Sequence, residues 1–562
     1  MLRTLRCIPV FVLSLSLTAA AQDAPLTSTS KDVDIVVRLN EPDKTVESVV
    51  ALVDAVQPGL GEMARAAVVE NLGRAISNRT LTGVDMTRSW YMTVHSQGRA
   101  EPLVVFAIPA IETGDLVGAL GDNVQSRVEG DWVFYTDKGD LPEAATGDDS
   151  VHAAMAEPIA KVLAQGELGI FVNADHLTQV YSEEIETGYE EVLEQLNNLR
   201  FAIPQNSGVN IGPVIEMYGT MVETFFQAVR DADAFSVAVS LDQKGIRIEE
   251  LAEFKSGTDS AKFLENLPTS PIAELSKLPK GAAAYYGLNN GVKELTRWGV
   301  GLSAGMSDDE ESREKIEAVI DQLDSVEMGS MAASVTIGDS ANGMIQAAGI
   351  AHADPMDKFK TYMRESIVAM NDIEFPGVTQ TSTIDEDGET FGDHKADVIS
   401  IEQEYDPSQP GVEMQEQLQK VMFGPDGIQS RVVYLDDAYL TIMGGGKDGA
   451  EQFLKNYQAG RENGLAESRE NLMEEVNAIL FVDVASGVAG IMKAVSTVEG
   501  LPPMPFDAQM IDNLYLTQSY IGTALAAEGR SARCRTDLPV AQMQNIAKLV
   551  MLFAPLAAGQ QF

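Results

Sequence analysis

The strongest constraint on the fold of this chain is a design that recurs along it. Each copy has two apolar runs, a glycine-bearing turn between them, and then a helical segment. The copies span residues 235–267, 331–363 and 519–549, with turn glycines Gly245, Gly343 and Gly529, and a degenerate copy spans 91–120. In the first copy Phe235, Val237 and Val239 alternate with smaller or polar residues, as in a strand with one buried face. Each copy therefore predicts an antiparallel β-hairpin followed by a helix. A change of phase at Glu249 and Glu250 suggests a bulge.

Each hairpin follows a strand-then-helix segment, so the repeating unit is strand, helix, hairpin, helix. The tetrapeptide QSRV at 125–128 and again at 429–432, each time before an aromatic strand, pairs the first unit with the third. We expect two halves, 33–272 and 273–562, each holding two units: 33–150, 151–272, 273–470 and 471–562. The predicted class is α+β, with duplicated antiparallel sheets of long β-hairpins and helices packed on one face.

One short motif carries a family resemblance. Residues 278–286 read LPKGAAAYY, an apolar strand entered through Leu278 and Pro279. This pattern resembles exported bacterial proteins of unknown function, in which such strands lead into helices and long hairpins. The resemblance implies the same architecture over most of the chain after its leader. It implies no reaction and transfers no functional residue.

The first residues have the layout of a secretory signal peptide. Arg3 and Arg6 precede an apolar stretch at 7–17, and Ala19 to Ala21 supply small residues for cleavage. We therefore expect a signal peptide at 1–21, cleavage after Ala21, and a flexible N-terminal segment at 22–32. The chain is then exported, to the periplasm or outside the cell. No later apolar run reaches the roughly 20 residues of a membrane span, so no transmembrane anchor is expected in the mature chain.

The mature protein is therefore expected to begin at Gln22. Mass spectrometry of the protein purified from its natural source checks this directly. An intact Met1–Ala21 would contradict the export prediction.

Charge and cysteine content exclude several classes of partner and linkage. Against 40 Lys and Arg stand 84 Asp and Glu, a formal net charge of −44. Such a chain repels nucleic-acid phosphates and anionic lipid surfaces. After the leader is removed, Cys534 is the one cysteine left, so no intramolecular disulfide can form.

The motifs that suggest catalysis lack their required context. Ser303 lies in a G-x-S-x-G pattern, but the residues before it favour a helix rather than the strand of a nucleophile elbow, so we predict that Ser303 is not a nucleophile. Five histidines without ligand spacing make a zinc or copper site improbable. We predict no catalytic residue and no cofactor.

A hard cation is harder to exclude on sequence grounds. Asp385, Asp387, Glu389 and Asp393 place four carboxylates around one turn, and Ca²⁺ prefers oxygen ligands. The alternative is a solvated hairpin turn, because Asp-Gly is an ordinary turn signal. These four residues are the candidate metal ligands of the chain.

The preferred function is an exported, non-catalytic scaffold or binding protein of the bacterial cell envelope. Its partner would be a protein, a polymer or an apolar ligand. The apolar segment 209–229 is expected to form the most buried helix, or alternatively a helix that faces a ligand or partner. Two other functions stay open: an extracytoplasmic hydrolase without a recognisable motif, and a carrier of an apolar ligand.

Overall fold

The computed structural model describes residues 24–96, 101–202, 212–289, 291–297, 300, 310–338, 343–369, 371, 378–405, 412–424, 427–496 and 508–559. The predicted signal peptide and Ser303 lie outside the described residues. Within the segment 22–32, residues 24–28 form the short helix α2 (Ala24–Ser28), whose Leu26 is buried. The chain divides into two compact units: residues 1–186, 227–264 and 528–535 form the first, and the remainder forms the second.

The first half of the chain alternates single strands, helices and hairpins. Its strands are β1 (Ile35–Leu39), β2 (Trp90–His95), β3 (Leu103–Pro109), β4 (Gln125–Glu129), β5 (Trp132–Thr136), β6 (Leu168–Val172), β7 (Ala232–Asp242) and β8 (Gly245–Phe254). Its further helices are α3 (Pro42–Val56), α4 (Gly61–Ala75), α5 (Thr113–Leu120), α6 (Val151–Ala154), α7 (Glu157–Leu163), α8 (Ala174–Val180), α9 (Ser182–Ala202), α10 (Gly212–Asp231) and α11 (Asp259–Glu265).

The second half repeats this order with one additional hairpin. Its strands are β9 (Ala284–Leu288), β10 (Glu327–Ile337), β11 (Ile345–Asp354), β12 (Val378–Phe391), β13 (His394–Tyr405), β14 (Ile428–Tyr434), β15 (Ala438–Met443), β16 (Ala478–Val482), β17 (Ile521–Glu528) and β18 (Ser531–Pro539). Its helices include α13 (Glu310–Gln322), α14 (Met356–Ala369), α15 (Val412–Phe423), α16 (Gly446–Gln458), α17 (Ala466–Arg469), α18 (Val484–Ser496), α19 (Ala508–Asp512) and α20 (Val540–Gly559).

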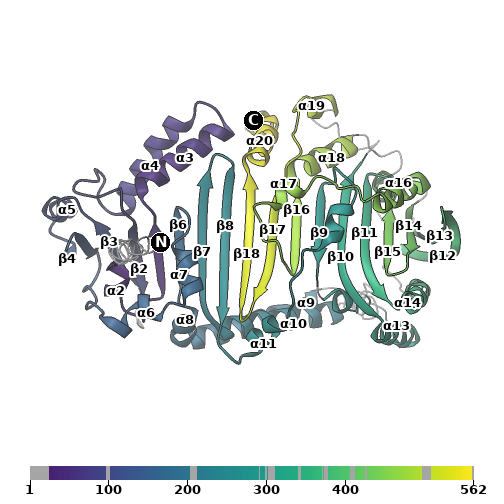
Figure 1. The fold of residues 1–562 in the computed structure, drawn as a ribbon, viewed down its shortest axis with the longest axis horizontal. Helices are drawn as coiled ribbons and strands as arrows, with labels where there is room; N and C mark the ends of the chain where they lie inside the picture. The colour runs from purple at the N-terminus through teal and green to yellow at the C-terminus, as the bar shows by residue number, and fades with distance from the viewer. Residues whose placement is uncertain are drawn as a thin grey trace, which may run out of the picture. The chain divides into compact units, whose positions relative to one another are not determined.

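Within the described residues, the strands form an open antiparallel sheet of 18 strands, which confirms the predicted α+β class (Figure 1). In the first half the strand order is β4-β5-β3-β2-β1-β6-β7-β8. In the second it is β14-β15-β11-β10-β9-β16-β17-β18, and the extra hairpin β12–β13 continues beyond β14. The two orders correspond strand for strand, as expected of a duplication.

Each predicted copy of the repeat has the expected structure. The hairpins β7–β8, β10–β11 and β17–β18 are followed by α11, α14 and α20, and the degenerate copy forms β2–β3 followed by α5. Gly529 lies at the tip of its hairpin with φ 61°, a conformation that glycine adopts without strain. The two QSRV segments lie in β4 and β14, which occupy equivalent positions in the two strand orders.

The predicted bulge at Glu249 and Glu250 is wrong. Both residues continue the regular β7–β8 register, opposite Ala238 and Val237. Glu249 occupies a buried position of the strand because Arg533 and Arg535 of β18 neutralise its carboxylate. The polar residue interrupts the apolar alternation without interrupting the strand.

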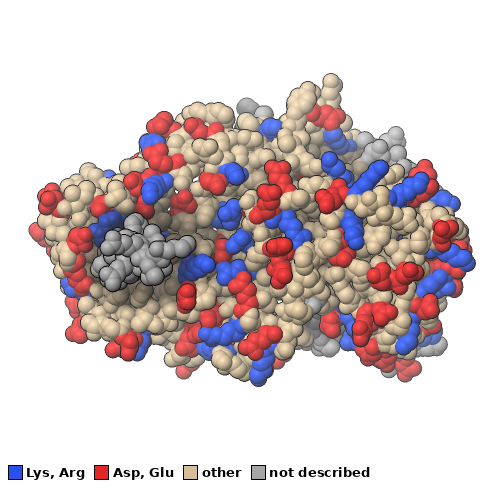
Figure 2. Space-filling model, in the orientation of Figure 1, with Lys and Arg blue, Asp and Glu red and all other residues tan. Residues whose placement is uncertain are grey.

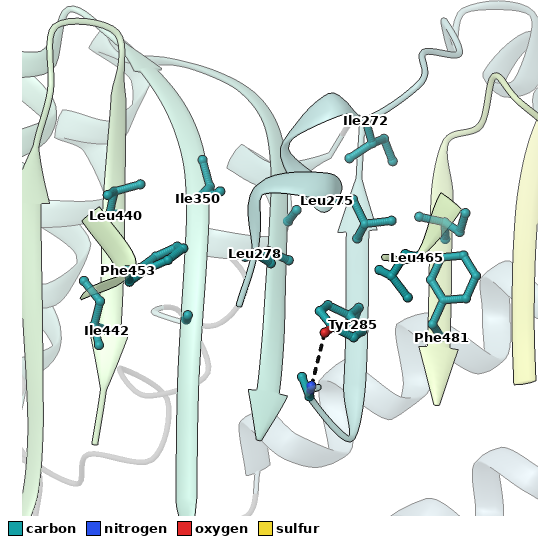
Figure 3. Packing of buried hydrophobic residues seen from close by; sticks show 14 of the residues in the cluster. Ile272, Leu275, Leu278, Tyr285, Ile350, Leu440, Ile442, Phe453, Leu465 and Phe481 are labelled. Atoms are coloured by element: carbon teal, nitrogen blue, oxygen red, sulfur yellow. Dashed lines mark hydrogen bonds between the residues drawn. The ribbon is translucent and has the colours of Figure 1, made fainter. Parts of the chain in front are cut away.

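The largest buried cluster lies on one face of the second unit's sheet (Figure 3). Tyr285, Ile350, Leu440 and Phe481 project from its strands, and Phe453 of α16 packs against them. The Tyr285 hydroxyl accepts a hydrogen bond from the Ala282 amide at 3.1 Å and donates one to the Pro279 carbonyl at 2.7 Å. The LPKGAAAYY segment therefore positions a buried tyrosine whose polar atom is satisfied.

Helix α14 covers part of the opposite face of this sheet. Its Phe359 stacks on Tyr439 with ring centroids 4.3 Å apart, and Tyr439 neighbours Leu440 in β15 but points the other way. Farther along this second face, Tyr286, Leu480 and Leu525 of β9, β16 and β17 are exposed. The second unit is therefore covered only in part on this side by the residues described.

Candidate functional site

Exposed apolar side chains gather in the second unit. Of the 19 large apolar residues that are exposed among those described, four lie in the first unit (Met63, Ile111, Val128 and Phe263) and the other fifteen in the second. Exposed apolar residues that are scattered have no special meaning, so this difference between the units only directs attention to the second unit.

The expectation that 209–229 forms the most buried helix is wrong. In α10, which covers residues 212–231, Tyr218, Met221 and Phe225 are 48, 56 and 64% exposed. Their spacing of three and four residues places them on one stripe of the helix. The segment is apolar on a side that solvent reaches, so apolar composition alone did not indicate burial. The alternative, that this helix faces a ligand or partner, stays a prediction.

A pocket of about 600 Å³ lies in the second unit, between the end of β10 and helices α18 and α19. Its apolar lining comes from Ile337, Ala489, Gly490, Ile511 and Leu516, with further small residues on the same helices. Among the described residues, its polar lining comes from Ser486, Lys493, Asp512 and Tyr515. A mostly apolar wall with a few polar groups is the usual composition of a small-molecule site.

Local sequence explains how α18 reaches this position. Asp483, nearly fully buried, follows β16 and accepts hydrogen bonds from the amide and hydroxyl of Ser486 at 3.0 and 2.7 Å, which fixes the start of the helix. One turn later, a Cβ on Gly490 would lie 2.5 Å from the side chain of Ile337. Glycine thus allows α18 to approach β10 closely and forms one wall of the pocket.

Charged and aromatic side chains line one part of the pocket. Lys493 of α18 forms an ion pair with Asp512 of α19, and both side chains are partly exposed. Tyr515 follows with φ 47°, a left-handed conformation that costs a tyrosine of order 1 kcal/mol. The Lys548 ammonium donates a hydrogen bond to the Tyr515 carbonyl at 3.1 Å, which helps to hold this backbone. The tyrosine itself is 78% exposed.

Helix α20 fixes the segment that carries Tyr515. Asn545 is buried, donates to the Thr517 carbonyl at 2.6 Å and accepts from the Thr517 amide at 3.3 Å. Such paired contacts to one backbone residue define the path of the chain next to the pocket. The pocket wall is therefore supported by polar contacts as well as by apolar packing.

The four predicted Ca²⁺ ligands lie on the hairpin β12–β13, where side-chain cations neutralise two of them. Asp387 pairs with Lys360 at 2.7 Å and Lys395 at 3.3 Å. The hydrogen bond from Lys360 holds the pKa of the Asp387 carboxyl below its usual value. Glu389 pairs with Arg431 at 2.9 Å, and Asp385 and Asp393 are exposed. Among the residues that the structure describes, no group of three or more His, Cys, Asp or Glu side chains could hold a metal ion. Calcium binding at this hairpin stays a prediction.

Acidic and basic side chains alternate over the face of the molecule seen in Figure 2. Long-range attraction of anions is disfavoured by the formal net charge of −44, whereas uncharged molecules experience no such barrier. In the described part of the chain, no helix combines the length and apolar character needed to cross a membrane.

Comparison with known proteins adds no family. No protein-family model and no curated protein matches this chain. Among solved structures, crystal form III of TP0453 aligns with 50% of this chain and 98% of its own, at 10% sequence identity and a TM-score of 0.21. We draw nothing about this chain from a likeness at that level.

Proposed function

We propose that this chain is an exported binding protein that holds an apolar small molecule in the pocket between β10, α18 and α19. The pocket itself carries the proposal, because its volume of about 600 Å³ lies within the 300–1,000 Å³ of typical small-molecule sites. The leader pattern of residues 1–21 supports a role outside the cytoplasm.

Binding in this pocket would be driven by removal of apolar surface from water. Ile337, Ile511 and Leu516 supply branched aliphatic surface, and the small side chains beside them leave room for a ligand. Each square ångström of apolar surface removed from water contributes about 25 cal/mol. The ligand class is therefore defined by apolar surface first and by polar groups second.

The test uses N-phenyl-1-naphthylamine, an uncharged dye whose fluorescence rises in an apolar site. We expect saturable binding to the wild-type chain. In Ala508→Trp an indole would occupy the pocket, because Ala508 lines it and is exposed enough to accept a larger side chain. The dye affinity is expected to fall about tenfold, equivalent to about 1.4 kcal/mol.

The matched control is Gln509→Trp, which adds the same side chain at the next exposed position of α19, outside the pocket lining. We expect its affinity for the dye to stay within about twofold of wild type. Equal affinities in the two tryptophan variants, or no saturable binding to the wild type, would refute the pocket as the site.

A further inference from the structure

We infer that this pocket selects a zwitterionic amphiphile, with its apolar chain against the aliphatic wall and its head group against the ion pair of Lys493 and Asp512 and against Tyr515. This inference rests on the proposed function and adds the ligand class. It depends on three polar side chains that line one pocket and come from α18, from α19 and from the segment that follows α19.

The first observation is that the pocket lining presents one charge of each sign. Lys493 and Asp512 both line the pocket and form a direct ion pair between two helices, and their side chains are 40 and 63% exposed. A ligand with a single negative charge would be attracted by Lys493 and repelled by Asp512. A ligand with a single positive charge would be attracted by Asp512 and repelled by Lys493. A head group that carries both charges can satisfy both residues.

The second observation concerns an aromatic side chain that lines the same pocket as the two charges. Tyr515 lies three residues after Asp512, lines the same pocket and is largely exposed. A pocket lined by both an aromatic ring and a carboxylate offers two groups that attract an ammonium, above all a quaternary one. The left-handed backbone of Tyr515, held by Lys548, indicates that this placement is maintained against local strain.

The third observation is the overall charge. A chain of net charge −44 repels anionic amphiphiles at long range, and it accumulates cationic ones over its whole surface without regard to this pocket. A zwitterion has no net charge, so its selection depends on the local pair. Specificity for it therefore comes from Lys493, Asp512 and Tyr515.

The experiment compares three amphiphiles with the same dodecyl-length chain for displacement of N-phenyl-1-naphthylamine, all below their micelle concentrations and in about 0.15 M salt to screen surface charge. Dodecylphosphocholine is expected to displace the dye at a concentration about fivefold lower than laurate or dodecyltrimethylammonium. This factor is the effect of one additional, partly exposed ion-pair contact between head group and pocket.

Removing one charge of the ion pair should favour the singly charged ligand that this charge repels. In Asp512→Asn, laurate should improve about fivefold relative to dodecylphosphocholine, because the repelling carboxylate is gone. In Lys493→Gln, the affinity for dodecyltrimethylammonium should rise by a similar factor relative to dodecylphosphocholine, because the repelling ammonium is gone. In Tyr515→Leu, both ammonium-bearing ligands should weaken relative to laurate. Because each variant is judged by a ratio measured on the same protein, a general loss of affinity does not affect the comparison.

Two failures can be distinguished. If the dye does not bind the wild-type chain, the proposed function is wrong. If the dye binds but all three amphiphiles displace it equally, or laurate is preferred, the pocket stands and the zwitterion inference is overturned. Affinity ratios that stay at their wild-type values in Asp512→Asn and Lys493→Gln would overturn it as well.

Discussion

Replacing Glu249 by alanine is expected to lower the free energy of unfolding of the first unit by about 3 kcal/mol, the low end of the range for breaking a buried ion pair. Glu249 lies on β8 with only 7% of its surface exposed. Its carboxylate accepts hydrogen bonds from the guanidinium groups of Arg533 and Arg535 on β18, the latter at 2.8 Å. Without it, Arg535 has no carboxylate partner among the residues that the structure describes, and a partly buried positive charge remains uncompensated.

In Glu249→Ala, Arg533 should contribute less to the loss of stability than Arg535. Arg533 also pairs with Glu528 at 2.8 Å, and this hydrogen bond is the main reason that the pKa of its guanidinium is raised. The double variant Glu249→Ala with Arg535→Ala should therefore recover part of the loss, because it removes the charge that the single variant leaves unpaired.

The control for this prediction is Glu250→Ala, the next residue of the strand, whose side chain points to the other face. Its effect should stay below about 1 kcal/mol. Thermal unfolding distinguishes the two, since 3 kcal/mol corresponds to a fall of roughly 6–12 °C in melting temperature for a unit of this size. Equal melting temperatures for the two variants would show that the Glu249 cluster does not stabilise the unit.

This cluster also shows a limit of local sequence patterns. Two consecutive glutamates in a strand suggested a bulge, because periodicity registers only the loss of apolar alternation. The compensating arginines lie 284 and 286 residues later in the chain. No window of neighbouring residues contains that information, although Arg533 and Arg535 in one strand, with Arg530 in the turn before it, were a visible sign of acidic partners.

The repeat itself was predictable because its determinants are local. Alternating apolar residues specify strands, and a glycine with positive φ such as Gly529 specifies the turn between them. The strand order was not predictable in detail, since it depends on which strand edges meet. The additional hairpin β12–β13 appeared in the sequence only as a cluster of carboxylates around a turn, and the structure supplies Lys360, Lys395 and Arg431 as their neighbours.

The pocket was missed for a related reason. Its wall combines one strand end, Ile337, with two helices that follow it by about 150 residues. A sequence signal did exist in α18, where Ala489, Gly490 and Ala494 are small and Lys493 stands among them. Small residues on one helical face indicate either that a neighbouring element packs closely or that a cavity lies there. The sequence does not show which, because the close packing of Ile337 against Gly490 is a contact between distant segments.

The other large effect is expected at Asp397, which is fully buried on β13. Its carboxylate accepts two hydrogen bonds from Arg364 of α14, at 2.8 and 2.7 Å. It accepts two more, from the Asp387 amide at 2.8 Å and the Tyr434 hydroxyl at 3.0 Å. One side chain thus joins α14 to three adjacent strands. We expect Asp397→Asn to destabilise the second unit by about 3 kcal/mol at pH 7, because Arg364 loses its one fully buried counter-charge among the described residues and keeps only the more exposed Glu386 and Asp387.

The pH dependence of this effect follows from the same contacts. Burial alone would raise the pKa of the Asp397 carboxyl, but the hydrogen bonds from Arg364, the Asp387 amide and Tyr434 outweigh it and hold the pKa below its ordinary value. Because the folded-state pKa lies below the unfolded value of about 3.9, the stabilisation is complete above that pH and is lost as pH falls through the folded-state pKa.

The difference in unfolding free energy between wild type and Asp397→Asn should therefore be constant from pH 7 to about 5 and shrink in acid, as wild-type Asp397 takes up a proton. Urea unfolding at several pH values measures it. Asp393→Asn is the matched control, since that carboxyl lies four residues earlier and is exposed, and its effect should stay within about 0.5 kcal/mol at every pH. A difference that grew in acid would require a folded-state pKa above the unfolded value, and the carboxylate would then not be the form that Arg364 binds.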